Sequence, residues 1–405
     1  MFLHLALSVA LVSCAAMGLE VDPILWTSPL NDTAELSTPV QWVATSESGV
    51  LIALSGDHLV RLNTTSGSVL WRSAPFTGFT ISTSIFAVSD TAVMAAAGTV
   101  VAAFHLINGS LIGSASIPAG TANPFNSGIT SITAQGGLFI VSGMENVAVF
   151  DSTLSLRYCA PTVEFYVLSL GASSHYLYFA AAQANATSIF LFIIDLTTFS
   201  ERRVSDVNYV SSAAANGNIL VVQNSRPLVA TIALSTGTFV WKNTDVVLNN
   251  VTTFVLIAST DVPLVVADNA VYAFDAVTGG LVFQYQTPFP TVSNPVVASG
   301  RLVYIGTPAQ GPSYVAAMDL STGKSLGQVM TPSLDSPALA ISGGNALMLN
   351  GQGYTRVNII KMLAASYNLD LAGSSAAVVV NQTPLATTFV VIGLKGATAV
   401  RIDAV

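Results

Sequence analysis

One short phrase recurs eight times along this chain: an apolar strand, a polar turn, and a second strand that tends to start with a large apolar residue. The clearest copies run over Leu59–Trp71, Val229–Trp241, Val271–Phe283 and Val315–Gly327. Successive copies lie roughly 40–45 residues apart, a period that is typical of one four-stranded blade of a β-propeller. Because each repeat cannot bury its own apolar faces, the repeats must stack against one another.

Glycine occupies the turn of five copies. These turn glycines are Gly67, Gly109, Gly237, Gly279 and Gly323. Glycine adopts the positive φ that a tight hairpin often demands, so we expect these positions to fix the turns. In the other three copies the same position holds Ser155, Phe199 and Ala365. We expect those turns to be wider or strained.

The repeats predict an all-β chain that forms a single β-propeller over residues 19–405. Eight hairpins and one blade divided between the two ends of the chain give nine blades; eight is the alternative, because rings of four to eight are typical. The segment from Ser375 to Val405 supplies three strands of the divided blade, and Ile24–Trp26 resembles its missing fourth strand. Pairing of the N-terminal strand with the C-terminal blade would close the ring.

The composition agrees with stacked sheets. Hydrophobic residues make up 52% of the chain and charged residues 8%, against about 25% charged in a typical soluble protein. Strands that are covered on both faces are nearly continuous apolar runs, and Ile189–Leu196 is such a run. Beyond the N-terminus no stretch reaches about 18 apolar residues, so we predict no transmembrane span. A net charge of −8 without a Lys/Arg cluster argues against nucleic-acid binding.

The first eighteen residues have the pattern of a secretory signal peptide: an apolar core followed by small residues. This predicts a secreted protein or one in the lumen of the secretory pathway. The alternative is a bacterial envelope lipoprotein, because Leu11-Val12-Ser13-Cys14 resembles a lipobox whose cysteine carries the lipid. After cleavage Cys159 would be the only cysteine, which leaves no intrachain disulfide in the mature chain.

Asn-x-Ser/Thr sequons are glycan acceptors if the chain enters a eukaryotic secretory pathway. The candidate glycosylation sites are Asn31, Asn63, Asn108, Asn185, Asn250 and Asn381. Asn63 and Asn108 fall where a strand meets a turn, so a glycan there could project outward.

The phrase Ala-Phe-Asp-Ala-Val-Thr-Gly at 273–279 and its copy at 317–323 resemble the repeat of quinoprotein-like (PQQ-repeat) propellers. In that family a Trp at the start of the following strand packs between blades. The residues expected to pack between blades here are Trp26, Trp71, Trp241 and Phe283. Gly113 and Gly327 stand where the pattern would place an aromatic residue. The layout is also similar to that of the propeller lipoprotein of the bacterial outer-membrane barrel-assembly machinery.

The resemblance allows three functions. The first is a non-catalytic scaffold that binds a protein partner, which is the prediction we favour. The second is an enzyme similar to the quinone-dependent dehydrogenases, with a site on the propeller axis; the chain lacks the adjacent cysteines and many of the acidic residues of those enzymes, so we assign no catalytic, cofactor-binding or metal-binding residue and expect no cofactor. The third is a bacterial outer-membrane assembly lipoprotein.

Overall fold

A computed structural model of the chain describes residues 24–28, 40–45, 51–55, 58–75, 85–116, 129–143, 147–160, 165–183, 189–211, 213–223, 228–248, 254–259, 261–267, 269–288, 291–298, 300–308, 312–331, 339–342, 345–349, 353–359, 362–368, 374–382, 386–393 and 396–403. Every regular element in these ranges is a β-strand, which confirms the predicted all-β class. No helix in them is long and apolar enough to span a bilayer. The predicted signal peptide, with Cys14, lies outside the described residues.

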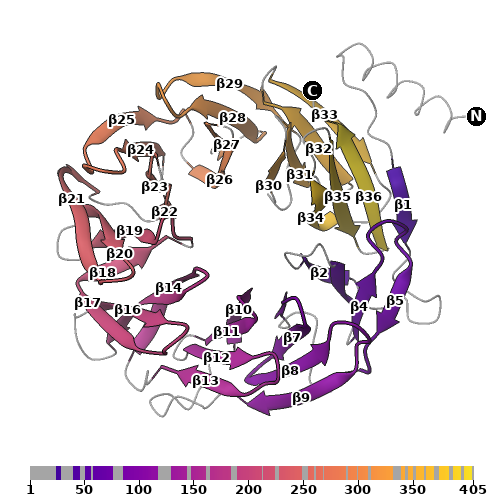
Figure 1. Cartoon of the computed structure of the whole chain (residues 1–405). Coiled ribbons are helices and arrows are strands. Elements are labelled where there is room, and N and C mark those ends of the chain that lie inside the picture. Colours follow the sequence, from indigo (N-terminus) through magenta and orange to yellow (C-terminus); the bar gives the residue numbers. More distant parts are fainter. Residues whose placement is uncertain are drawn as a thin grey trace, which may run out of the picture. The chain divides into compact units, whose positions relative to one another are not determined.

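The strands form nine four-stranded antiparallel sheets. In all but one of them the four strands follow one another in the chain, so each sheet is a simple meander. The chain divides into two compact units, one formed by Met1–Pro75, Ser293–Asp319 and Ser325–Val405 and the other by Phe76–Val292 and Leu320–Lys324. Each unit is described by itself below, with strand labels as in Figure 1.

The first unit contains four of the sheets. Their strands are β2 (Val40–Thr45), β3 (Leu51–Ser55), β4 (His58–Leu62) and β5 (Val69–Arg72); β26 (Thr291–Ala298), β27 (Arg301–Thr307), β28 (Tyr314–Asp319) and β29 (Ser325–Met330); β30 (Leu339–Ser342), β31 (Asn345–Leu349), β32 (Gly353–Asn358) and β33 (Leu363–Asn368); and β1 (Ile24–Ser28) with β34 (Ser374–Gln382), β35 (Ala386–Gly393) and β36 (Gly396–Asp403).

The second unit contains the other five. Their strands are β6 (Ile85–Val88), β7 (Ala92–Ala97), β8 (Val100–His105) and β9 (Leu111–Ser116); β10 (Ile129–Gln135), β11 (Leu138–Gly143), β12 (Val147–Asp151) and β13 (Leu156–Cys159); β14 (Phe165–Ala172), β15 (Tyr176–Gln183), β16 (Ile189–Asp195) and β17 (Glu201–Ser205); β18 (Val207–Val210), β19 (Asn218–Gln223), β20 (Leu228–Ala233) and β21 (Thr238–Val247); and β22 (Phe254–Ile257), β23 (Leu264–Ala267), β24 (Ala270–Phe274) and β25 (Leu281–Gln286).

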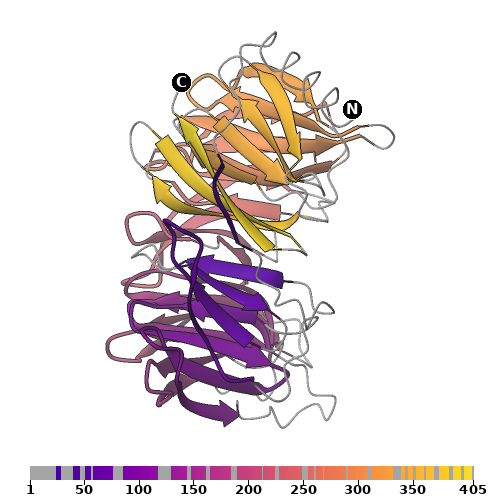
Figure 2. The ribbon, with the colours of Figure 1, turned by 90° about the vertical axis from the view of Figure 1, so that its right-hand side faces the viewer.

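The sheet of β34, β35 and β36 takes its fourth strand from the other end of the chain. β1 pairs antiparallel with β36, with Trp26 opposite Ala399 and Ser28 opposite Ala397 (Figure 2). The strand predicted at Ile24–Trp26 is therefore present, and it pairs as the sequence indicated. The side chain of Trp26 lies outside what the structure describes.

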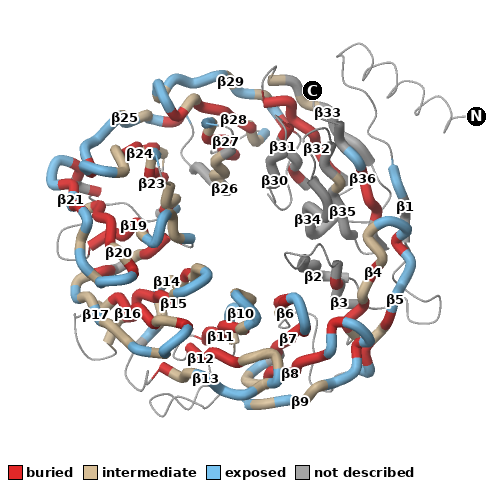
Figure 3. The backbone as a smooth tube through the Cα atoms, in the orientation of Figure 1, coloured by how far each residue is buried: buried red, intermediate tan, exposed pale blue. Residues whose placement is uncertain are grey.

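The second and third strands of the sheets carry the core, as the burial colours show (Figure 3). In β15, Leu177, Phe179 and Ala181 enter the core shared with the preceding sheet. The alternate residues Tyr178 and Ala180 enter the core shared with the following sheet. Successive side chains of a strand point to opposite faces, so a strand between two sheets must be apolar at every position. This explains the apolar runs without a membrane.

Candidate interaction surface

The five turn glycines all have positive φ, between 67° and 72°. In the β24–β25 turn the Gly279 N–H donates to the Asp275 carbonyl over 2.9 Å, and the same bond joins Gly237 to Ala233 and Gly67 to Asn63. A side chain would be strained at this backbone conformation. These glycines hold the turn that places the fourth strand of each sheet.

The first residue of the turn is held by its own side chain. The Oδ1 atom of Asp275 accepts hydrogen bonds from the N–H groups of Val277, at 3.0 Å, and Thr278, at 2.7 Å. These bonds, with one from the Thr278 hydroxyl, lower the pKa of Asp275. Asn63 takes the same role in the β4–β5 turn.

Three turns have a positive-φ residue that is not glycine. These residues are Leu154 (φ 66°), Phe199 (φ 55°) and Met362 (φ 51°). The prediction of a strained turn is correct at Phe199, but it was wrong at Ser155 and Ala365. The β12–β13 turn is one residue shorter than the others, because the Leu154 N–H bonds to the carbonyl of Asp151, three residues earlier.

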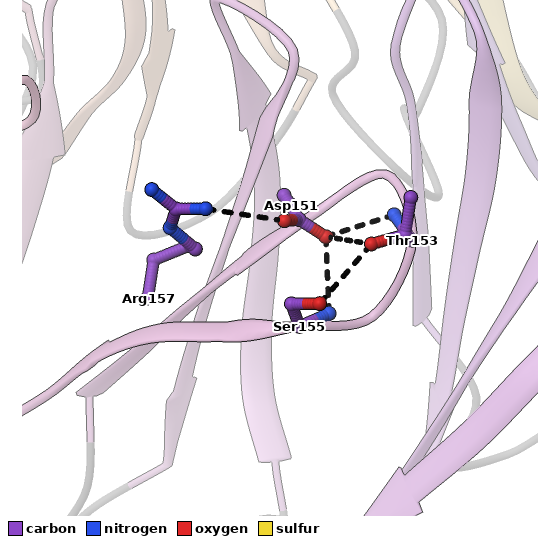
Figure 4. A network of polar contacts seen from close by, with 4 residues as sticks. All are labelled: Asp151, Thr153, Ser155 and Arg157. Carbon is purple, nitrogen blue, oxygen red and sulfur yellow. Dashed lines mark hydrogen bonds and ion pairs between the residues drawn. The ribbon is translucent and has the colours of Figure 1, made fainter.

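The shortened turn is held by a polar network around Asp151 (Figure 4). Its Oδ1 atom accepts from the Thr153 N–H and hydroxyl and from the Ser155 N–H, at 2.7–3.0 Å. Arg157 lies 3.6 Å from Oδ2 and also stands over the Phe199 ring of the next sheet, 5.8 Å from its centroid. Partial burial raises the pKa of Asp151, but the hydrogen bonds outweigh it, and the pKa is lowered overall. The network accommodates a turn without glycine.

Large side chains on the fourth strands pack on the turn glycine of the next sheet. Trp241 on β21 lies so close to Gly279 that a Cβ atom there would be 2.4 Å from the indole ring. The Trp241 Nε1–H also donates to the Ala276 carbonyl over 3.0 Å. Phe283 on β25 meets Gly323 in the same way, with a Cβ distance of 2.6 Å. These contacts fit the expected packing role of the two aromatic residues; Trp71 is also buried, at 9% exposure.

Where the fourth strand has glycine instead, the sizes are exchanged. A Cβ atom at Gly113 would lie 3.4 Å from the Leu154 side chain, and one at Gly327 would lie 3.0 Å from Met362. Leu154 and Met362 are two of the residues with positive φ. The strained turn residue thus fills the space that an aromatic residue fills elsewhere.

Asn243 makes a further link that the sequence analysis missed. Its side chain is 3% exposed, and its Nδ2 atom donates to the Gly279 carbonyl over 2.7 Å. Its Oδ1 atom accepts from the N–H groups of Asp245 and Val246, at 3.0 and 2.8 Å. The only sequence signal was an Asn two positions after the packing Trp. Together Trp241 and Asn243 fix the β22–β25 sheet against its neighbour.

The candidate glycosylation sites differ in their surroundings. Asn108 is exposed, and its Oδ1 atom accepts from the Ser110 N–H and hydroxyl. Asn63 is half-buried and holds its turn, as described above. Asn381 pairs with Thr388 through the backbone, and its side chain is not described. Asn31, Asn185 and Asn250 lie outside the described residues.

The fourth strand of each sheet has a neighbour on one side only. On β9, β25 and β29 this edge strand contains no charged residue. It does contain exposed apolar side chains: Leu111 is 53% exposed, Val282 50% and Met330 61%. Proteins usually protect free sheet edges with lysine or other charges. These strands therefore form the candidate interaction surface.

No group of three or more His, Cys, Asp or Glu residues that could hold a metal ion occurs within the described ranges. His58 contacts the Ser73 carbonyl at 2.8 Å, which is a structural role. Cys159 is a half-buried free thiol whose pKa is raised by burial.

Repeated four-stranded meanders, with an aromatic residue of one sheet on the turn glycine of the next, define a β-propeller of the PQQ-repeat class. The chain belongs to the family of the outer membrane protein assembly factor BamB, whose model matches residues 22–186 and 197–362. No curated protein matches the sequence significantly.

Solved structures support the propeller fold. BamB from Moraxella catarrhalis is 12% identical, with a TM-score of 0.50 over 89% of this chain and 95% of that one. Sqt1 from Saccharomyces cerevisiae is 11% identical, with a TM-score of 0.55 over 80% and 96%. The Dos1 propeller is 12% identical, with a TM-score of 0.54 over 78% and 90%. At these identities the likeness concerns the fold alone.

Proposed function

We propose that this protein is a non-catalytic scaffold in a secreted or lumenal compartment, and that it binds a protein partner on its fourth strands. The observation that carries the proposal is the uncharged, apolar character of β9, β25 and β29. An exposed edge of this kind offers unpaired backbone groups and apolar side chains to an incoming extended segment.

The physical argument rests on what such an edge would otherwise do. A bare apolar edge strand favours aggregation, and a chain with 8% charged residues has few charges to oppose it. A partner that pairs with the edge would satisfy the backbone groups and cover Leu281 and Val282, which are 39% and 50% exposed. Membership of a family described as an assembly factor supports a binding role.

Site-specific photo-cross-linking in the native compartment tests the proposal. A photoreactive residue at Val282, on the uncharged β25, should give a discrete cross-linked product with another protein. The matched control is the exposed Thr244 on β21, between Lys242 and Asp245, which should give much less. Equal labelling at both positions, or none at Val282, would contradict docking on the edge.

The rival function is a quinone-dependent enzyme. Calorimetry and absorbance with pyrroloquinoline quinone and calcium provide the decisive measurement. Our proposal expects no saturable uptake, and stoichiometric binding would overturn the non-catalytic assignment.

A second candidate function is that of a bacterial envelope lipoprotein in outer-membrane assembly. The family match and the Leu11-Val12-Ser13-Cys14 segment favour it. Mass spectrometry of the mature N-terminus separates the two forms. A diacylglyceryl group on Cys14 would establish the lipoprotein, whereas a free N-terminus after Ala16 or Gly18 would support the secreted form.

A further inference from the structure

A small pocket lies between the β18–β21 and β22–β25 sheets, in the second unit. It has a volume of about 190 Å³ and lies at the end of the sheets where the turns after β18 and β24 meet. Leu220 and Pro263 form part of its apolar wall, and Asn216, Asn218 and Ser259 supply polar groups. Val277 also lines it and is 81% exposed.

The walls of the pocket are held by hydrogen bonds that exist without a ligand. Trp241 donates to the carbonyl of Ala276, which lines the pocket. The Ser259 hydroxyl accepts from the N–H groups of Asp261 and Val262, each at 3.3 Å. Ala215 and Asn218 exchange two backbone hydrogen bonds of 2.9 Å across their turn. A pocket that is already formed costs little ordering entropy when it is filled.

The volume decides between kinds of ligand. Pockets for cofactors and drug-sized molecules measure about 300–1,000 Å³, so this one is too small for such a molecule. It is large enough for one aliphatic side chain. None of its lining residues is charged, so a charged group would lose its hydration there without gaining an ion pair.

We propose that this pocket binds a single aliphatic side chain from an extended, uncharged segment of a partner protein. The polar side chains around it suit the amide groups on either side of that residue, and the exposed Val277 extends the apolar contact. The inference rests on the proposed scaffold function and adds to it a second contact, away from the β25 edge.

The test uses a display library of short random peptides selected on the full, purified chain. Selected sequences should share an uncharged stretch with one Leu, Ile, Val or Met. A fluorescent copy of the best peptide is then measured by fluorescence polarisation. Val277→Asp should weaken its binding roughly tenfold or more, and Asn216→Asp should also weaken it.

Ile107→Asp is the matched control. Ile107 occupies the corresponding position in the β8–β9 turn and is 85% exposed, but it does not line the pocket. The control variant should bind like the wild type, and all variants should keep the wild-type melting temperature. Peptides that are charged, that bind Val277→Asp and wild type equally, or that cannot be selected at all would overturn the pocket. Cross-linking at Val282 reports on the scaffold independently, so the two ideas can fail separately.

Discussion

Gly279 combines two constraints at one Cα atom: a φ of +72° and the Trp241 ring against its face. Replacement by alanine adds strain of about 1–2 kcal/mol for the left-handed backbone and forces the indole to move, at a further cost of about 1–3 kcal/mol. We expect Gly279→Ala to lower the free energy of unfolding by about 2–4 kcal/mol in urea denaturation.

Gly300→Ala separates the two contributions. Gly300 has a φ of +70°, but nothing lies within 4 Å of a Cβ atom there. This variant should lose only the conformational part, about 1–2 kcal/mol. Equal losses in both variants would show that the contact with Trp241 carries no weight.

The turn carboxylates make stability depend on pH. The pKa of Asp275 lies below its ordinary value because the backbone N–H of Thr278, its hydroxyl and the N–H of Val277 bond to the carboxylate. The contribution is therefore complete above the ordinary carboxyl pKa of about 3.9 and is lost as the pH falls through the lowered value.

The melting temperatures of wild type and Asp275→Asn measure this effect between about pH 6 and pH 2. Asn keeps an acceptor oxygen but carries no charge. The wild type should melt higher at the neutral end, and the difference should vanish at the acid end. A difference that does not change with pH would mean that the charge has no role.

At the scale of single elements, the sequence predicted hairpins and glycine turns where the Asp-x-x-Thr-Gly pattern is intact. It did not predict which residue takes the positive φ in the β12–β13 and β32–β33 turns. A turn shortened by one residue moves that conformation from Ser155 to Leu154, and no local pattern records the shift. The compensation of Gly113 by Leu154 lies across two sheets, so it becomes visible only once the sheets are placed.

Asn243 joins two elements, β21 and the turn after β24. Asn243→Ala leaves the N–H groups of Asp245 and Val246 and the Gly279 carbonyl without this partner. We expect a loss of about 2–3 kcal/mol in the free energy of unfolding, measured by urea denaturation. The neighbouring exposed residue provides the control, since Thr244→Ala should change stability by less than about 0.5 kcal/mol. A neutral effect of Asn243→Ala would mean that water replaces the side chain there.

At the scale of the whole molecule, the period of the repeat predicted the all-β class and the pairing of the first strand with the last sheet. It could not predict where a partner binds. The pocket is lined from residues 215 to 277, in two different sheets. The exposed edge strands use the same residue types as the buried ones, so composition does not distinguish them.

Removal of β1 tests the pairing of the two ends. A chain that begins after Ser28 leaves β36 without its neighbour, and an unpaired strand favours association with another chain. We expect a lower melting temperature and self-association in size-exclusion chromatography with light scattering. A chain that begins at Ile24 retains β1 and serves as the control. If both truncations are equally stable and monomeric, β1 does not contribute to the native sheet.

The exchange of large and small residues between successive sheets has an evolutionary consequence. Each repeat is matched to the one that follows it: Trp241 requires a glycine in the next turn, whereas Gly113 requires a bulky residue there. Unequal recombination that deletes or duplicates a single repeat would join mismatched partners, either colliding or leaving a void. The linear order of the repeats should therefore be inherited as a unit, even while the individual sequences diverge.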